Sequence, residues 1–309
     1  MSLPETRKHN YDDSFVLGSI AGGAVLSCLI PPSLLFIVYG SSAQVSIGKL
    51  FIAGIIPGIL LVLMYMVTIT LICTKNPNLA PASEKLPRKE ALRQSPGMIF
   101  LIIVFVVIIG GIYLGIFTPT EAGAFGVVTV FVLGLLRRRI NKTTLLDTFK
   151  ETAGTLGMVG FMLAGSMILQ QFVISTGIPD GLRQVMTGLG DSQVLFWVVT
   201  IILMFILGMV IDALPLLLLV TPIMYPIALD FGVDPVHFGV ALVVLMLIGS
   251  LTPPVGMIVY ALAGVAKDVP MGKIFKGVMP FIVTMVIFAA LVVIFPQLSL
   301  FLVNLMFGA

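Results

Sequence analysis

Long uncharged stretches dominate this chain, and they limit its possible folds more than any other feature. Most of them approach or exceed the roughly 20 residues that an apolar helix needs to cross a bilayer. They cover residues 14–48, 50–74, 97–120, 122–136, 152–179, 192–211, 213–229, 235–266 and 277–309. Only 10% of the residues are charged and 59% are hydrophobic, whereas soluble domains have about 25% charged residues. We therefore expect an all-α polytopic membrane protein whose solvent is the lipid bilayer.

Two adjacent uncharged runs are short and are separated by one charge. Residues 192–211 and 213–229 flank Asp212, a pattern that favours a re-entrant hairpin at about 192–229 over two full spans. Gly208 would permit a tight tip. A carboxylate at membrane depth indicates an ion or substrate site. The competing interpretation is that Asp212 only caps the second hairpin helix, a position where aspartate is favoured.

Lysine and arginine predict the orientation of the spans. The basic loops 75–96 and 137–150 are separated by two spans, so they share a side, which we assign to the cytoplasm. Counting spans outward leaves only Lys49 and Arg183, of 17 Lys and Arg residues, off that side. The count holds only if the hairpin enters and leaves the membrane on the same face.

A pair of prolines interrupts the run at 235–266. Proline inside a helix removes a hydrogen bond and clashes with the preceding turn, and lipid offers the freed carbonyls no partner. One interpretation is an unwound turn whose carbonyls bind a cation, followed by a half-helix whose N-terminus faces an anion. The other is a kink satisfied by neighbouring helices. The candidate residues are Gly249, Thr252, Pro253, Pro254 and Gly256.

The same break occurs near the N-terminus, which favours the ion-site interpretation. The stretch 27–40, "SCLIPPSLLFIVYG", resembles 249–262, "GSLTPPVGMIVYAL", with the two Pro-Pro pairs 222 positions apart. Asp12 and Asp234 keep the same spacing, and a Gly-Lys-x-Phe pattern follows both breaks. Oxygen-rich backbone suits a hard cation such as sodium. The candidate residues of the first break are Ser27, Pro31, Pro32 and Ser33.

The repeat predicts three parts in the chain. Residues 1–74 are the C-terminal part of a first copy, 75–96 a cytoplasmic connector, and 97–309 a second copy that contains the hairpin. The span count gives the copies opposite orientations, and inverted repeats with broken helices are typical of secondary transporters. At this spacing about 125 residues of the first copy, with its hairpin, are expected to be absent. We therefore expect the second site to be the better formed.

Local sequence gives Glu121 a structural role. In "FTPTEAG", Thr118 is expected at the N-cap of a helix, Pro119 at its first position and Glu121 at its third. This arrangement predicts a capping box, in which the threonine and glutamate side chains each bond to the other's backbone N–H.

Longer stretches resemble the large membrane subunit of the TRAP (tripartite ATP-independent periplasmic) transporters. They are "NYDDSFVLGSIAGG", "SIGKLFIAGIIPG", "GIFTPTEAGAFGV", "GMVIDALPLLLLVTPIMYPIALDFGVDPVHFGV" and "IGSLTPPVG". The resemblance implies an elevator-type fold in the bacterial inner membrane, with a scaffold and a mobile domain. It implies a small four-helix membrane subunit, a periplasmic substrate-binding protein, a carboxylate substrate and sodium coupling at the residues named above. Ser27 and Cys28 stand where the family usually carries Gly-Pro.

Other function classes lack support in the sequence. No phosphate-cradling loop and no Ser/His/Asp or Cys/His set is evident, so we expect no ATP hydrolysis, no enzyme activity, no organic cofactor and no nucleic-acid partner. Two alternatives to a TRAP subunit stay open. One is a stand-alone dicarboxylate or citrate-type ion-coupled carrier, and the other is a truncated membrane scaffold that does not transport. The substrate, and sodium against proton coupling, are also left open.

Overall fold

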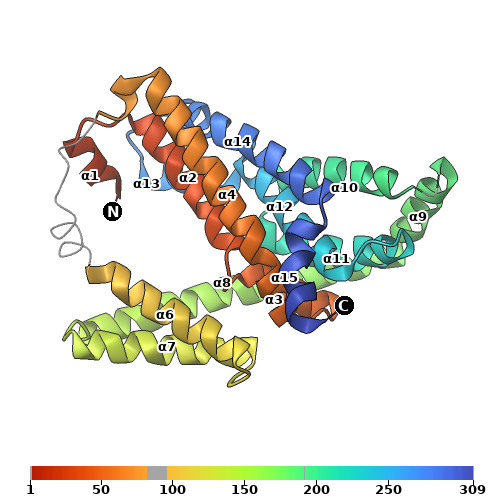
Figure 1. The fold of residues 1–309 in the computed structure, drawn as a ribbon, viewed down its shortest axis with the longest axis horizontal. Coiled ribbons are helices and arrows are strands. Elements are labelled where there is room, and N and C mark those ends of the chain that lie inside the picture. The colour runs from red at the N-terminus through yellow and green to blue at the C-terminus, as the bar shows by residue number, and fades with distance from the viewer. Residues whose placement is uncertain (1, 82–95, 191, 309) are drawn as a thin grey trace. The chain divides into compact units, whose positions relative to one another are not determined.

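The computed structural model describes residues 2–81, 96–190 and 192–308, and these ranges form helices joined by turns, with no β-strand (Figure 1). This confirms the predicted all-α fold. The elements are α1 (Ser2–Lys8), α2 (Asp13–Leu29), α3 (Leu34–Ala43), α4 (Ile47–Lys75), the 3-10 helix η1 (Pro77–Leu79), α6 (Pro96–Tyr113), α7 (Pro119–Leu136), α8 (Lys142–Ser175), α9 (Ile178–Leu189), α10 (Gln193–Gly208), α11 (Ala213–Asp230), α12 (Pro235–Leu251), α13 (Met257–Val265), α14 (Met271–Ile294) and α15 (Gln297–Phe307).

Membrane-spanning potential is distributed along the whole chain. Within the described ranges, five helical segments are long and apolar enough to cross a membrane. One of them combines α2 and α3, which are separated by the first Pro-Pro break. The chain is therefore a polytopic membrane protein, as predicted. The segments are Asp13–Ala43, Ile47–Lys75, Lys142–Ser175, Ala213–Asp230 and Met271–Ile294.

The chain divides into two compact units. The larger comprises Met1–Ser83 and Ser166–Ala309, and the smaller comprises Glu84–Gly165. This division differs from the order of the predicted repeat copies, because α2 and α4 of the first copy pack with α12 and α14 of the second. The two Pro-Pro helices α2 and α12 each have 17 residues and an aspartate N-cap. Their inverted relationship remains a prediction.

Helix α12 lies at the centre of the larger unit. Every residue from Val236 to Leu251 is buried, and the helix packs against α2, α4, α10, α11 and α14. A helix that is apolar on all sides is expected in such an interior position. The other helices that carry candidate site residues, α2 and α10, therefore both pack against this central helix.

Helices α2 and α14 approach each other through glycine. A Cβ atom added to Gly18 would overlap the carbonyl of Gly277, and one added to Gly277 would overlap the carbonyl of Ser14. The Ser14 hydroxyl donates a hydrogen bond of 2.6 Å to the carbonyl of Lys273, next to this contact. Small residues allow helices in lipid to pack backbone to backbone, so these two glycines fix the distance between α2 and α14 (Figure 1).

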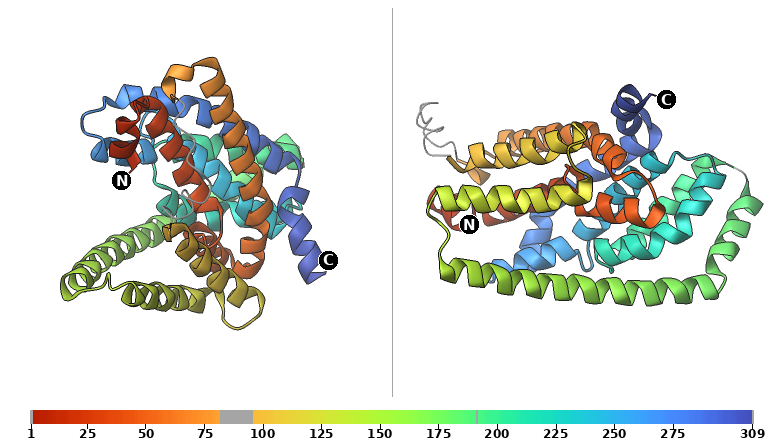
Figure 2. Two further views of the ribbon diagram at one scale, coloured as in Figure 1. Left: turned by 60° about the vertical axis from the view of Figure 1, so that its left-hand side comes forward. Right: turned by 90° about the horizontal axis from the view of Figure 1, so that it is seen from below.

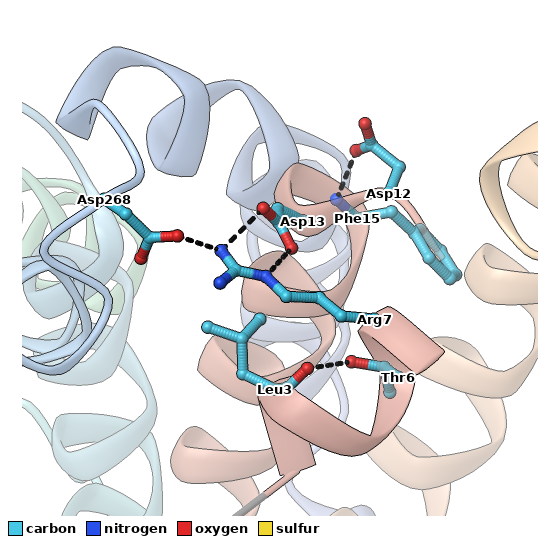
Figure 3. Close-up of polar contacts among 7 residues, drawn as sticks. All are labelled: Leu3, Thr6, Arg7, Asp12, Asp13, Phe15 and Asp268. Atoms are coloured by element: carbon cyan, nitrogen blue, oxygen red, sulfur yellow. Dashed lines mark hydrogen bonds and ion pairs between the residues drawn. The ribbon is translucent and has the colours of Figure 1, made fainter. Parts of the chain in front are cut away.

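Helix α1 is joined to the start of α2 and to the loop before α14 by one arginine (Figure 3). The Arg7 guanidinium donates to both carboxylate oxygens of Asp13 at 2.8 Å and pairs with Asp268 at 2.6 Å. The hydrogen bonds that Arg7 donates to Asp13 and, next, to Asp268 raise the pKa of Arg7 above its usual value, so it stays charged. This ion pair links segments of the two predicted repeat copies.

In the smaller unit, α6 and α7 form a helical hairpin (Figure 2). The capping box predicted at the start of α7 is confirmed. The Thr118 N–H donates to Glu121 Oε2 at 2.7 Å, and the Glu121 N–H donates to Thr118 Oγ1 at 3.3 Å. Glu121 thus has the local structural role that its spacing indicated.

We predict that Gly277→Ala destabilises the larger unit by about 1–3 kcal/mol, because the added methyl overlaps backbone that cannot rotate away. The measurement is the unfolding midpoint of the purified chain in detergent. Gly272→Ala is the matched control, since it lies in the same helix and its added Cβ would meet nothing within 4 Å. Equal stability of the two variants would contradict the close approach of α2 and α14.

Candidate ion and substrate site at the helix breaks

The second break separates α12 from α13. Helix α12 ends with the Thr252 N–H bonded to the carbonyl of Gly249 at 3.0 Å, while the Thr252 hydroxyl donates to the carbonyl of Ile248 at 2.7 Å. Helix α13 begins at Met257, and its N-cap residue Gly256 has a φ of 58°, in the left-handed region that favours glycine. Among the described residues, the carbonyls of Pro253 and Pro254 accept no backbone hydrogen bond. They remain available to a ligand.

The first break separates α2 from α3 and uses a serine as its cap. The Ser33 side chain accepts a hydrogen bond from the Phe36 N–H at 3.4 Å and donates one to the carbonyl of Cys28. Ser33 and Pro31 are buried, whereas Pro32 is exposed. Both Pro-Pro bonds, at Pro31–Pro32 and Pro253–Pro254, are cis. The serine hydroxyl thus holds the end of α2 and the start of α3 together.

Helices α10 and α11 are joined by a short turn at the predicted hairpin, and its re-entrant path in the membrane remains a prediction. Both helices pack against α12. Helix α9 precedes α10 and also contacts α11, and Arg183 of α9 pairs with Asp230 at the end of α11 at 2.8 Å. The two outer ends of the hairpin therefore lie near the same helix (Figure 1), as a hairpin that returns to its starting side requires. The structure places the tip at residues 209–212.

Glycine brings the hairpin tip onto the end of the central helix. A Cβ added to Gly249 would lie 2.5 Å from the carbonyl carbon of Gly208 and 2.6 Å from its Cα. Both neighbours are backbone atoms, so no side chain can move aside. The two glycines singled out in the sequence are thus in direct contact, three residues before Thr252.

Asp212 is the N-cap residue of α11 by position, but its side chain makes no capping hydrogen bond. Asp212 is half-buried, and helix α11, which begins directly after it, packs against α3, which follows the first break. The hairpin therefore contacts helices that adjoin both breaks, α3 at the first and α12 at the second. The geometry weakens the purely capping interpretation, because the expected hydrogen bond to the backbone is not formed.

The chemistry of this region follows from three interrupted helices. Helices α2, α10 and α12 each end at a break, and their C-terminal carbonyls carry partial negative charge. Helices α3, α11 and α13 begin there, and their first N–H groups carry partial positive charge. Carbonyl, hydroxyl and carboxylate oxygens suit a hard cation, while helix N-termini suit an anionic group. The helix breaks therefore present both oxygen ligands and helix N-termini.

In the described part of the chain, one candidate residue of the first break, Ser27, makes no hydrogen bond across the break. Ser27 is exposed and its hydroxyl donates to the carbonyl of Ala24 within its own helix at 2.7 Å. Cys28 was not among the candidate residues, yet its carbonyl accepts the hydrogen bond from the Ser33 hydroxyl. The sequence feature that could have indicated this role of Cys28 is its position three residues before the Pro-Pro pair.

The outer half of the hairpin is anchored by aromatic side chains. Phe196 of α10 stacks on Phe231 with ring centroids 5.8 Å apart and contacts Phe238 of α12 at 5.9 Å. Tyr39 of α3 is buried, packs on Phe238, and donates a hydrogen bond to the carbonyl of Pro235 at 2.7 Å. The hairpin base is thus held by large rings, whereas its tip is held by the glycine contact.

Comparison with known proteins identifies the family of the chain. A family model described as "Tripartite ATP-independent periplasmic transporter, DctM component" matches residues 1–298. The sialic acid TRAP transporter large permease of Vibrio cholerae is 34% identical over 309 residues, covering 100% of this chain and 72% of that protein.

Two further relatives show the range of the family. The C4-dicarboxylate TRAP transporter large permease of Pseudomonas aeruginosa is 33% identical over 298 residues, covering 96% of this chain and 69% of that protein. The 2,3-diketo-L-gulonate TRAP transporter large permease of Escherichia coli is 32% identical over 297 residues, with the same two coverages. The family match over nearly all of the sequence, together with the helix breaks and the hairpin, shows that this chain belongs to the DctM family of TRAP transporter large permeases.

Proposed function

We propose that this chain carries out sodium-coupled secondary transport of a carboxylate across the bacterial inner membrane, as a large permease subunit. The observation that carries the proposal is the hairpin tip, where Gly208 contacts Gly249 at the second break and the Asp212 carboxylate makes no capping hydrogen bond. Helix α11, which follows this tip, packs against both α3 and α12, the helices that adjoin the two Pro-Pro breaks. Intramembrane carboxylates and broken helices are features of ion-coupled carriers.

Coupling follows from the charges at the breaks. A sodium ion bound by carbonyl oxygens near Thr252 or Ser33 would offset the Asp212 charge and the negative helix ends. The potential felt by a substrate carboxylate at the helix N-termini would then become more favourable. Because binding linkage is reciprocal, the substrate would strengthen sodium binding by the same factor. The two solutes would therefore be carried together.

Movement of the site is assigned to the larger unit. It contains both breaks, the hairpin and the central helix α12, so it would carry the bound solutes as one body. The smaller unit, with α6 and α7, would belong to the scaffold. This division supports an elevator mechanism, in which a transport domain slides past a fixed partner and exposes the site alternately on each side.

The names of the relatives support an anionic substrate. They transport sialic acid, C4-dicarboxylates and 2,3-diketo-L-gulonate, which all carry a carboxylate group. Family membership favours a TRAP subunit over a stand-alone citrate-type carrier. We therefore include a small four-helix membrane subunit and a periplasmic substrate-binding protein in the proposal. The basic loops 75–96 and 137–150 would face the cytoplasm.

Uptake by reconstituted vesicles tests the proposal. The chain would be placed in vesicles with its small subunit, supplied with its binding protein, and given labelled C4-dicarboxylate and sialic acid in separate assays. An inward sodium gradient should raise uptake of a carboxylate at least about tenfold, since each 1.4 kcal/mol of driving free energy gives a factor of ten. Equal uptake with potassium replacing sodium would contradict sodium coupling. Absence of uptake under every gradient would favour a non-transporting scaffold.

Asp212→Asn should reduce sodium-driven uptake about 10- to 100-fold, because an interaction with a charged group contributes about 1.5–3 kcal/mol. The half-saturating sodium concentration should rise in the same assay. Asp230→Asn is the matched control at the opposite end of α11. Its carboxylate pairs with Arg183 in a partly exposed ion pair, which contributes little, so uptake should stay within about twofold. If both variants transport normally, Asp212 is not a site residue.

Gly249→Ala should abolish most of the uptake while leaving helix content unchanged. The added methyl would overlap the Gly208 backbone and push the hairpin tip away from α12, which typically destabilises a packed contact by about 1–3 kcal/mol. Gly264→Ala is the control, since its added Cβ would meet nothing within 4 Å. Circular dichroism and uptake would be measured on the same preparations. Normal transport by Gly249→Ala would show that the close contact is dispensable.

A further inference from the structure

A groove in the smaller unit lies apart from the helix breaks. It runs between α6 and α7, has a volume of about 300 Å³, and combines an apolar floor with arginines. Its surface is mostly apolar, in contrast to that of a site for a small polar solute. The lining residues are Phe100, Val104, Val130, Leu133, Gly134, Arg137 and Arg139.

The backbone at the end of α7 brings two arginines to the rim of this groove. The Arg138 N–H donates to the carbonyl of Leu135 at 2.9 Å, and the Arg139 N–H donates to the carbonyl of Gly134 at 3.0 Å. This pair of bonds is the Schellman arrangement that ends a helix. Ile140 then packs over Gly134, where an added Cβ would lie 2.7 Å from its Cδ1. The chain is thereby folded back so that Arg139 lines the groove.

Arginine also occupies a backbone position that favours glycine. Arg138 has a φ of 52°, in the left-handed region, where a residue with a Cβ is less stable than glycine by about 1 kcal/mol. The guanidinium of Arg137 lies over the Phe100 ring, 3.5 Å from its centroid. That contact fixes one positive group at the boundary between the apolar floor and the basic rim.

The pairing of an apolar groove with a basic rim fits a molecule that is apolar at one end and anionic at the other. The predicted orientation puts this rim on the cytoplasmic side, where anionic phospholipids attract basic segments by about 1 kcal/mol per Lys or Arg. Arginine binds a phosphodiester through several N–H donors at once. A substrate carboxylate would not use the apolar floor, so a lipid explains more of the groove.

We propose that the groove between α6 and α7 binds one anionic phospholipid, with its phosphodiester between Arg137 and Arg139 and an acyl chain along Val104, Val130 and Leu133. The lipid would contact both α6 and α7 and would cover the apolar groove between them. The site is independent of the transport proposal, because none of its residues belongs to the helix breaks.

Native mass spectrometry of the purified full chain tests this site. The probes are phosphatidylglycerol and phosphatidylcholine with the same acyl chains, and inorganic phosphate. The wild-type chain should retain phosphatidylglycerol about tenfold more than phosphatidylcholine. The double variant Arg137→Gln, Arg139→Gln should lose this preference, whereas the charge-matched Lys142→Gln, Lys150→Gln should keep it. Equal retention by the wild type and the arginine variant would overturn the proposal.

A second pair of variants tests the groove without changing charge. Val130→Trp would fill the apolar floor and should reduce retained phosphatidylglycerol about tenfold. Val127→Trp is the control, since Val127 lies on the same helix, is exposed, and does not line the groove. Two results would overturn the proposal: undiminished retention by Val130→Trp, or displacement of the lipid by inorganic phosphate alone. Either would show that the arginines bind phosphate while the groove binds no acyl chain.

Discussion

The backbone of a helix that breaks inside lipid loses hydrogen bonds that water cannot replace, and the arrangement of the larger unit follows from this constraint. The breaks after α2 and α12 both leave carbonyls that need polar surroundings. The fold packs α2, α10 and α11 around the fully buried helix α12 and brings the hairpin tip, which carries Asp212, to the end of that helix. Apolar surface elsewhere can then face lipid, while polar groups gather where solutes are proposed to bind.

The hairpin is held by different forces at its two ends. At its base, Phe196 and Phe231 bury large rings against α12, and the Arg183–Asp230 ion pair ties α9 to α11. At its tip, the backbone of Gly208 contacts the backbone of Gly249 directly, because neither residue has a side chain. Aromatic pairs contribute about 0.5–1.5 kcal/mol beyond area burial, whereas a glycine contact buries little apolar surface. A hairpin with more buried apolar surface at its base than at its tip suits a proposed site whose tip must move to admit solutes.

Local patterns were the most predictable features. The Thr118–Glu121 capping box depends on residues three apart in one helix, so its geometry was readable from spacing alone. The hairpin turn was likewise indicated by short runs on each side of Asp212. The missing capping bond of Asp212 was not predictable, because side-chain orientation depends on what packs around the tip. Cys28 gained importance only when the structure placed its carbonyl against the Ser33 hydroxyl.

The sequence by itself determined that this is an all-α membrane protein, where its helices break, and which family it resembles. Hydropathy, proline and glycine determine where helices form and break through effects that extend over a few residues, and lipid leaves the backbone few alternatives to a helix. Only the tertiary structure decided that Gly208 meets Gly249, that helices of both predicted repeat copies form one unit, and that two arginines rim an apolar groove. These contacts join segments far apart in the chain, and their geometry depends on packing that no local pattern specifies.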